Sequence, residues 1–154
     1  MSENPSPVDY DGNKRYWLFN TDETEEEGEG AYLDMLNQSV IAAWGNCKGV
    51  GAERTLNRPN EGETVFFYLA GTGIIAAGEV EGRAFSASTI FGQRGEYHRR
   101  VINVRRKLLR PLTFADVREN TGYSLPVHGC IVCQLKNEPA ARYILQYFNV
   151  GPYG

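Results

Sequence analysis

The chain has 154 residues, of which 42% are hydrophobic and 23% are charged, a composition typical of one globular domain. No run of about 18 apolar residues occurs, which argues against a transmembrane helix and a membrane partner. Three cysteines, an odd number, and an N-terminus without a signal-peptide pattern favour a reducing, cytoplasmic location. The formal net charge of −3 does not by itself indicate a nucleic-acid partner.

The charges are, however, segregated along the chain. Residues 22–29 hold six acidic side chains, whereas residues 83–110 hold eight basic side chains and one acid. Because binding depends on the local field rather than on the total charge, the basic segment favours an anionic partner. A solvated basic face beside an acidic loop is the simpler alternative.

The first half of the chain contains signals for short elements. Residues 1–14 include Pro5, Pro7 and Gly12, and we expect a flexible leader before a single domain at residues 15–150. The pattern then predicts strands at 15–20 and 40–45, a helix at 32–36 and a helical turn at 54–56.

The centre of the chain predicts a β-hairpin, with strands at 64–70 and 74–80 joined by a turn at 71–73. Residues 71–76 also match G-x-G-x-x-A, the phosphate-binding signature of dinucleotide folds. That signature requires a helix to follow, whereas residues 74–80 are rich in β-branched side chains and contain Gly78. The hairpin is therefore favoured.

The second half predicts a loop at 82–97, a strand at 98–109, a strand at 129–135 and two helices. One helix covers 114–119 with Thr113 as its N-cap, and the other opens at Pro139. Strands outnumber helices and are not separated by long helical crossovers. The predicted fold class is therefore α+β, a small mixed β-barrel flanked by short helices.

Cys130 and Cys133 form a C-x-x-C pair beside His128. The pair lies in a strand-like run, where residues three apart point to opposite faces, so the two sulfurs diverge. Inert cysteines are favoured over a zinc site, and no metal or other cofactor is expected.

Three aromatic residues, Trp17, Trp44 and Tyr68, lie at or near the ends of expected strands, beside turn residues. Aromatic rings that converge there can enclose a flat ligand, with Asn or Thr side chains reading its polar edge. Next to a basic strand, a nucleobase is the expected flat ligand. The alternative is that the tryptophans fill the core.

Several segments in fixed order resemble the EVE domain family, a PUA-like group related in outline to YTH domains. They are Tyr16-Trp17-Leu18-Phe19, Ala43-Trp44-Gly45-Asn46, and residues 61–68, 74–80 and 106–118. The resemblance spans residues 15–148, although the acidic insertion after Thr21, Leu69-Ala70 after the aromatic strand and the dense basic loop depart from the family pattern.

The resemblance implies a pocket for a flipped, modified base of DNA or RNA. The residues expected at this base pocket are Trp17, Asn20, Trp44, Gly45, Asn46, Tyr68, Gly71 and Thr72. Those expected to contact phosphates are Arg94, Arg99, Arg100, Arg105 and Arg106. The predicted function is therefore a nucleic-acid-binding domain without enzymatic activity.

Two other functions remain open from the sequence. One is an enzyme acting on a nucleotide or nucleic acid, with Glu79, Glu81 or His128 as acid or base. The other is a protein-interaction module that uses the acidic residues 22–29.

Overall fold

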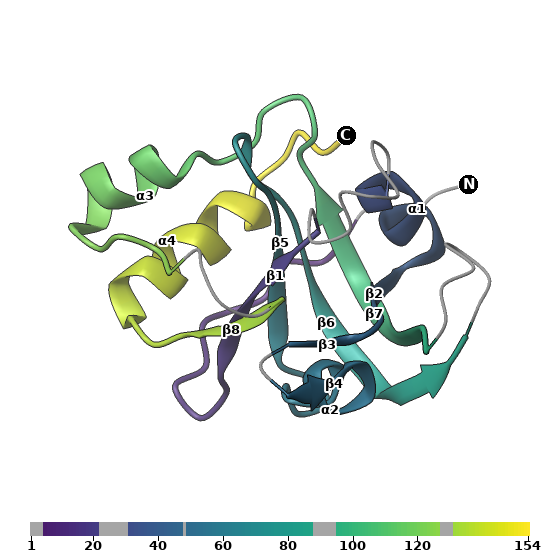
Figure 1. Ribbon diagram of the computed structural model, residues 1–154. Helices are drawn as coiled ribbons and strands as arrows, with labels where there is room; N and C mark the ends of the chain where they lie inside the picture. Colours follow the sequence, from purple (N-terminus) through teal and green to yellow (C-terminus); the bar gives the residue numbers. More distant parts are fainter. Residues whose placement is uncertain (1–4, 22–30, 48, 88–94, 127–130) are drawn as a thin grey trace.

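The computed structural model describes residues 5–21, 31–47, 49–87, 95–126 and 131–154 (Figure 1). The strands are β1 (Tyr16–Asn20), β2 (Val40–Ala43), β3 (Asn46–Cys47), β4 (Val50–Gly51), β5 (Thr64–Leu69), β6 (Gly73–Ser86), β7 (Tyr97–Arg106) and β8 (Val132–Leu135). The helices are α1 (Ala31–Gln38), α2 (Ala52–Leu56), α3 (Phe114–Thr121) and α4 (Glu138–Asn149). Each strand and helix expected from the sequence has a counterpart among them.

Six strands form one curled sheet in the order β2-β7-β6-β5-β1-β8. β1 runs parallel to β5, with Tyr16 opposite Thr64, and every other neighbouring pair is antiparallel. The predicted α+β class, a small mixed sheet curled toward a barrel and flanked by short helices, is confirmed.

Both faces of the sheet are covered, so the chain has two hydrophobic cores. The α1/α2 core contains Trp17 and Phe19 of β1 together with side chains of α1 and α2. The α3/α4 core contains Tyr16 and Leu18 of the same strand, and here α3 and α4 supply the cover. Alternate residues of β1 therefore enter opposite cores, and for this reason β1 is apolar throughout rather than alternating.

Local sequence chemistry sets the ends of α3 and α4. Thr113 caps α3, its hydroxyl accepting a hydrogen bond from the Asp116 N–H at 3.1 Å, as predicted. Asn137 caps α4 in the same way through the Ala140 N–H at 3.0 Å, with a proline in the first turn.

β6 extends further than the sequence indicated. Residues 82–86 were expected to be a loop, but they continue the strand, because Phe85 pairs with His98 and Ser86 with Tyr97. The hydrogen bonds to β7 outweigh the weak strand propensity of this glycine-containing segment.

Residues 5–14, expected to be part of a flexible leader, lie against the domain instead. Ser6 exchanges two hydrogen bonds with the side-chain amide of Asn103, at 2.7 and 2.8 Å. Val8 exchanges two more with the amide of Asn149, both at 2.9 Å. These four hydrogen bonds connect the segment to β7 and α4, while residues 1–4 lie outside the described part of the chain.

Two classes of feature are absent from the described residues. No helix there is long and apolar enough to cross a membrane. Nor does that part of the chain contain a group of three His, Cys, Asp or Glu side chains able to hold a metal ion.

Candidate nucleic-acid interface

A pocket of about 490 Å³ lies at the end of the β5–β6 hairpin, where α3 begins. Four of the residues predicted for the base pocket line it, namely Asn20, Tyr68, Gly71 and Thr72. The other lining residues are Leu69, Ala70, Gly73, Thr113 and Phe114. We call this the hairpin pocket.

The turn that forms one wall depends on two glycines. The Thr72 N–H donates to the Leu69 carbonyl at 3.0 Å, and Gly71 has φ +81°. Gly73 has φ +134°, and a Cβ on it would lie 2.5 Å from the Leu112 carbonyl oxygen. Only glycine permits both this backbone conformation and this close approach.

The opposite wall, at the start of α3, is held beside the hairpin by a short backbone pairing between Ile74 and Leu112. Ile74 and Leu112 exchange hydrogen bonds of 2.8 and 2.9 Å. This pairing places the start of α3 beside the hairpin, so that Phe114 meets Tyr68 edge-on, with ring centroids 5.3 Å apart at 61°. The lining of the hairpin pocket is therefore largely apolar, and Asn20 and Thr72 add polar side chains to it.

Trp17, predicted to be a pocket wall, belongs to the α1/α2 core and is 1% exposed. Its indole N–H donates to Glu63 at 3.0 Å, and the guanidinium groups of Arg15 and Arg58 lie 4.9 and 5.2 Å from its ring. The sequence prediction for Trp17 is therefore corrected, because a base could stack on this ring only by displacing the core.

The Glu63 carboxylate that holds Trp17 also accepts the backbone N–H groups of Arg15 and Asn60, at 3.0 and 2.8 Å. Burial alone would raise the pKa of Glu63, but these hydrogen bonds and the charge of Arg15 outweigh it and lower the pKa. Glu63 is thus a charged structural centre rather than a proton donor.

Trp44 and Gly45 do not line the hairpin pocket, and the Asn46 side chain lies outside the described part of the structure. They follow β2, whose last residue is Ala43. Ala43 pairs with Tyr97, and Tyr97 pairs with Ser86 at the end of β6 opposite the hairpin turn. Trp44 is half-buried, and Gly45 has φ +72° in an exposed turn. Trp44 and Gly45 therefore lie apart from the four predicted residues that line the hairpin pocket.

Two arginines predicted to contact phosphates are buried. Arg99 is 2% exposed, and its guanidinium donates to the carbonyls of Gly82, Leu56 and Pro59. Arg105 is fully buried and forms an ion pair with Glu79 at 2.8 Å. Both predictions are corrected, because these side chains satisfy internal acceptors and do not reach the surface.

The other predicted cations differ in exposure. Arg100 is exposed and lies over the ring of Phe85 at 5.7 Å. Arg106 is half-buried, donates to Asn37 at 3.2 Å, and pairs with Ala76 at the hairpin end of the sheet. Arg94 lies outside the described residues.

The proposed acid–base residues show no catalytic arrangement in the described part of the chain. Glu79 is held by Arg105 and by the Asn103 amide at 3.1 Å, and Glu81 is exposed. Glu96 and His98 form a buried, directly hydrogen-bonded pair beside Phe85. His128, Cys130 and the acidic residues 22–29 lie outside the described residues.

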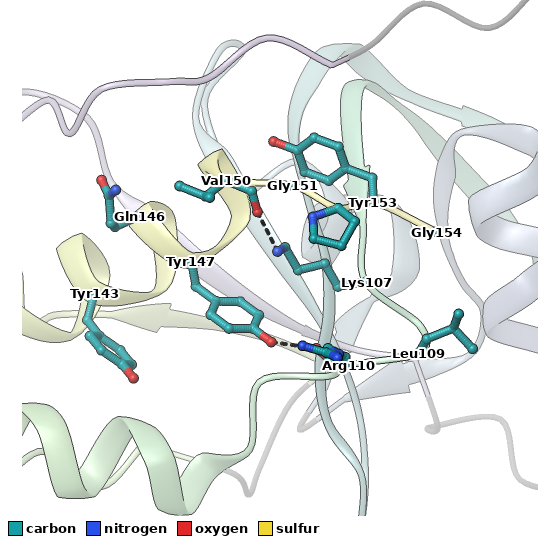
Figure 2. A pocket seen from close by; sticks show the side chains of 11 residues that line it. Lys107, Leu109, Arg110, Tyr143, Gln146, Tyr147, Val150, Gly151, Tyr153 and Gly154 are labelled. Carbon is teal, nitrogen blue, oxygen red and sulfur yellow. Dashed lines mark hydrogen bonds between the residues drawn. The ribbon is translucent and has the colours of Figure 1, made fainter.

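Sequence reasoning missed part of the hairpin pocket and all of a second one. Thr113 was expected as a helix cap, but its place beside the hairpin, like that of Phe114, depends on the Ile74–Leu112 pairing, which has no sequence signal. A second pocket contains Lys107 and Arg110 beside tyrosines of α4 (Figure 2). Tyr143 and Tyr147 of α4 are partly buried, packing against the α3/α4 core while they line this pocket.

Comparison with solved structures identifies the fold. The YTH domain of the Zygosaccharomyces rouxii MRB1 protein, solved in complex with N6-methyladenosine RNA, matches 97% of each chain with 12% identity and a TM-score of 0.57. Protein PSPTO5229 from Pseudomonas syringae matches 86% of this chain and 99% of its own, with 14% identity and a TM-score of 0.51.

No family model matches the sequence, and no curated protein matches it. The EVE assignment therefore stays a prediction, while the relation to YTH domains agrees with the first of these structures. At such identities the similarity concerns the fold, and the chain shares the curled α+β fold of a YTH domain.

Proposed function

We propose that this domain binds nucleic acid and recognises a modified base in the hairpin pocket, without catalysing a reaction. The observation that carries the proposal is the pocket itself, which gathers an amide side chain, a hydroxyl and an apolar aromatic wall at one end of the sheet. Its volume of about 490 Å³ falls within the roughly 300–1,000 Å³ typical of ligand pockets.

The chemistry of the walls suits a flipped base. Asn20 carries both a donor and an acceptor for a base edge, and Thr72 adds an exposed hydroxyl. Leu69 and Phe114 provide apolar contact for a methyl group, which contributes about 0.8 kcal/mol when buried. The YTH structure with N6-methyladenosine RNA supports a methylated base as the ligand class.

Phosphates flanking the base would meet cations on β7. Arg106 pairs with Ala76, two residues from Ile74, so it lies at the hairpin end of the sheet. Arg100 lies further along the same strand and is exposed. Each phosphate contact should reduce the affinity as the salt concentration rises, with a slope of about −0.7 in log–log form for a single strand.

The test is binding of the purified protein to short DNA and RNA oligonucleotides, with and without methylated or hydroxymethylated bases, at two salt concentrations. Thr72→Trp places a large ring in the pocket from an exposed turn and should abolish the preference for the modified base. Glu119→Trp, on the exposed face of α3 and outside the pocket, is the matched control. Trp44→Ala reports whether the distant tryptophan takes part.

Salt-dependent binding that prefers one modified base and is lost only in Thr72→Trp would support the proposal and identify DNA or RNA. Equal binding by Thr72→Trp and Glu119→Trp would contradict the assignment to the hairpin pocket. Absence of binding to every oligonucleotide would contradict the function as a whole.

A further inference from the structure

The second pocket, about 500 Å³ in volume, lies between the C-terminal half of α4, the segment after β7 and the last residues of the chain (Figure 2). Its walls carry Lys107, Leu109, Arg110, Tyr143, Gln146, Tyr147 and residues 150–154. It shares no residue with the hairpin pocket. We call it the tyrosine pocket.

The walls of the tyrosine pocket are fixed by backbone hydrogen bonds. The Lys107 N–H donates to the Ile75 carbonyl at 2.8 Å, which ties this segment to β6. Gly154 pairs with the chain after β7 through the Leu108 N–H at 2.8 Å and the Arg106 carbonyl at 2.9 Å. The Tyr147 hydroxyl donates to the Arg110 carbonyl at 2.7 Å and joins α4 to the opposite wall.

Lys107 is a nearly buried cation, only 8% exposed. Its ammonium group donates to the Val150 carbonyl and lies 4.6 Å from the Tyr147 ring centroid and 5.6 Å from that of Tyr153. Within the part of the chain that the structure describes, it forms no ion pair with a carboxylate. Its positive charge is therefore met by dipoles and ring faces but not by a counter-ion.

A second cation lines the same pocket. The Arg110 side chain is exposed, and its guanidinium forms neither a hydrogen bond nor an ion pair with the described residues. Burial first, and then the charge of Arg110, lower the pKa of Lys107 from its ordinary value. An anion in the pocket would interact favourably with both cations.

The remaining surface is suited to a flat ring. Tyr143, Tyr147 and Tyr153 contribute aromatic surface, and Leu109 adds an apolar side chain that is 90% exposed. Aromatic faces bind nucleobases by stacking with little dependence on base identity, whereas paired cations bind phosphate. A carboxylate alone would use the cations and leave the rings without a partner.

From this arrangement we infer that the tyrosine pocket binds a nucleotide, with its phosphate at Lys107 and Arg110 and its base against the tyrosines. The nucleotide has two chemical sources, a free mononucleotide or the 5′-phosphorylated end of a strand. The inference is independent of base recognition in the hairpin pocket, because the two pockets share no lining residue.

The experiment titrates the full chain by calorimetry with AMP, adenosine and a short oligonucleotide prepared with and without a 5′-phosphate. Whichever of the two ligands binds, mononucleotide or strand end, should bind at least about tenfold more tightly with its phosphate than without it. The reason is that charge-assisted hydrogen bonds are lost when the phosphate is removed. Arg110→Gln should weaken binding by about tenfold. Arg118→Gln, an exposed cation on α3 that lines neither pocket, should leave the affinity unchanged.

A second readout follows the Lys107 ammonium by NMR in lysine-labelled protein. Phosphate bound beside it favours the charged form, so the nucleotide should raise the Lys107 pKa. Saturable binding of AMP supports a free nucleotide, and saturable binding of the 5′-phosphorylated strand alone supports a strand end.

Thr72→Trp separates this inference from base recognition, because it obstructs the hairpin pocket and should leave AMP or strand-end binding intact. The inference is overturned if no probe saturates, if removal of the phosphate leaves the affinity unchanged, or if Arg110→Gln binds like Arg118→Gln. An unchanged Lys107 signal at saturation would also overturn the assigned phosphate position.

Discussion

The side-chain amide of Asn103 binds the backbone of Ser6 on both sides, accepting from its N–H at 2.7 Å and donating to its carbonyl at 2.8 Å. Asn103 has φ +53°, which belongs to the bulge where β7 has more residues than β6. Asn149 holds Val8 in the same two-bond manner. The N-terminal segment is thus bound to the domain through the backbone groups of Ser6 and Val8.

Asn103→Gly should release this segment without unfolding the domain. Glycine keeps the positive φ and removes the amide, so the two hydrogen bonds to Ser6, of about 1 kcal/mol each, are lost together with the one to Glu79. Amide hydrogen exchange at Ser6 should accelerate by roughly 30-fold, which corresponds to about 2 kcal/mol. Exchange in β5 serves as the internal reference, and unchanged exchange at Ser6 would contradict the role assigned to Asn103.

Glu63→Gln should remove a pH-dependent part of the stability. The pKa of Glu63 is lowered in the folded state from its ordinary value of 4.5, so its contribution is present above that pH and is lost as the pH falls through the folded value. Urea unfolding should show the largest difference between wild type and Glu63→Gln near neutral pH and a smaller one at about pH 3. Glu81→Gln, at an exposed position, is the matched control, and a pH-independent difference for Glu63→Gln would contradict the linkage.

Arg99→Ala should unfold the protein at much lower denaturant than Arg100→Ala. Removing the buried guanidinium leaves the Gly82, Leu56 and Pro59 carbonyls without their donor, at a cost of about 1–3 kcal/mol per group. Arg100 is exposed, so Arg100→Ala should change the free energy of unfolding by less than about 0.5 kcal/mol. If both variants were equally stable, the structural role of Arg99 would be refuted.

The Glu79–Arg105 ion pair should show strong coupling in a double-mutant cycle. Each single change, Glu79→Leu or Arg105→Leu, leaves a buried charge without its partner and should cost about 3–5 kcal/mol. The double change removes both charges and should cost less than the sum of the single changes. Additive costs, measured by urea unfolding, would show that the pair contributes no interaction energy.

Local sequence chemistry was sufficient to predict most of the elements. Thr113 capped its helix, and the glycines at 71 and 73 formed a hairpin turn rather than a phosphate loop, because the residues after them are β-branched. These signals act over a few residues. They require no knowledge of which strand lies beside which.

The prediction for Arg105 failed because both faces of the sheet are covered along β7. Val101 pairs with Val80 and enters the α1/α2 core, whereas Arg105, four residues later, pairs with Ala77, which belongs to the α3/α4 core. The bulge at Asn103 reverses the faces and so moves Arg105 from one covered face of the sheet to the other. The charge of Arg105 therefore led to a predicted surface position, whereas its side chain is fully buried.

The base-pocket prediction failed in part for a related reason. Residues near strand ends were expected to converge, but β2 pairs with β7 and not with β1 or β5, which separates Trp44 from Asn20 and Tyr68. Strand order depends on contacts between residues far apart in the chain, and no pattern within a strand encodes it.

The place of β1 in the sheet has a consequence for synthesis on the ribosome. Tyr16 pairs with Thr64 on one side and with Leu135 on the other. β1 is therefore synthesised before both of its neighbours, β5 and β8. A nascent chain that has not yet exposed β8 leaves one edge of β1 unpaired, and such edges recruit other chains. The sheet is therefore complete only after β8 has left the ribosome, and chains that end before Leu135 should aggregate rather than form a smaller stable domain.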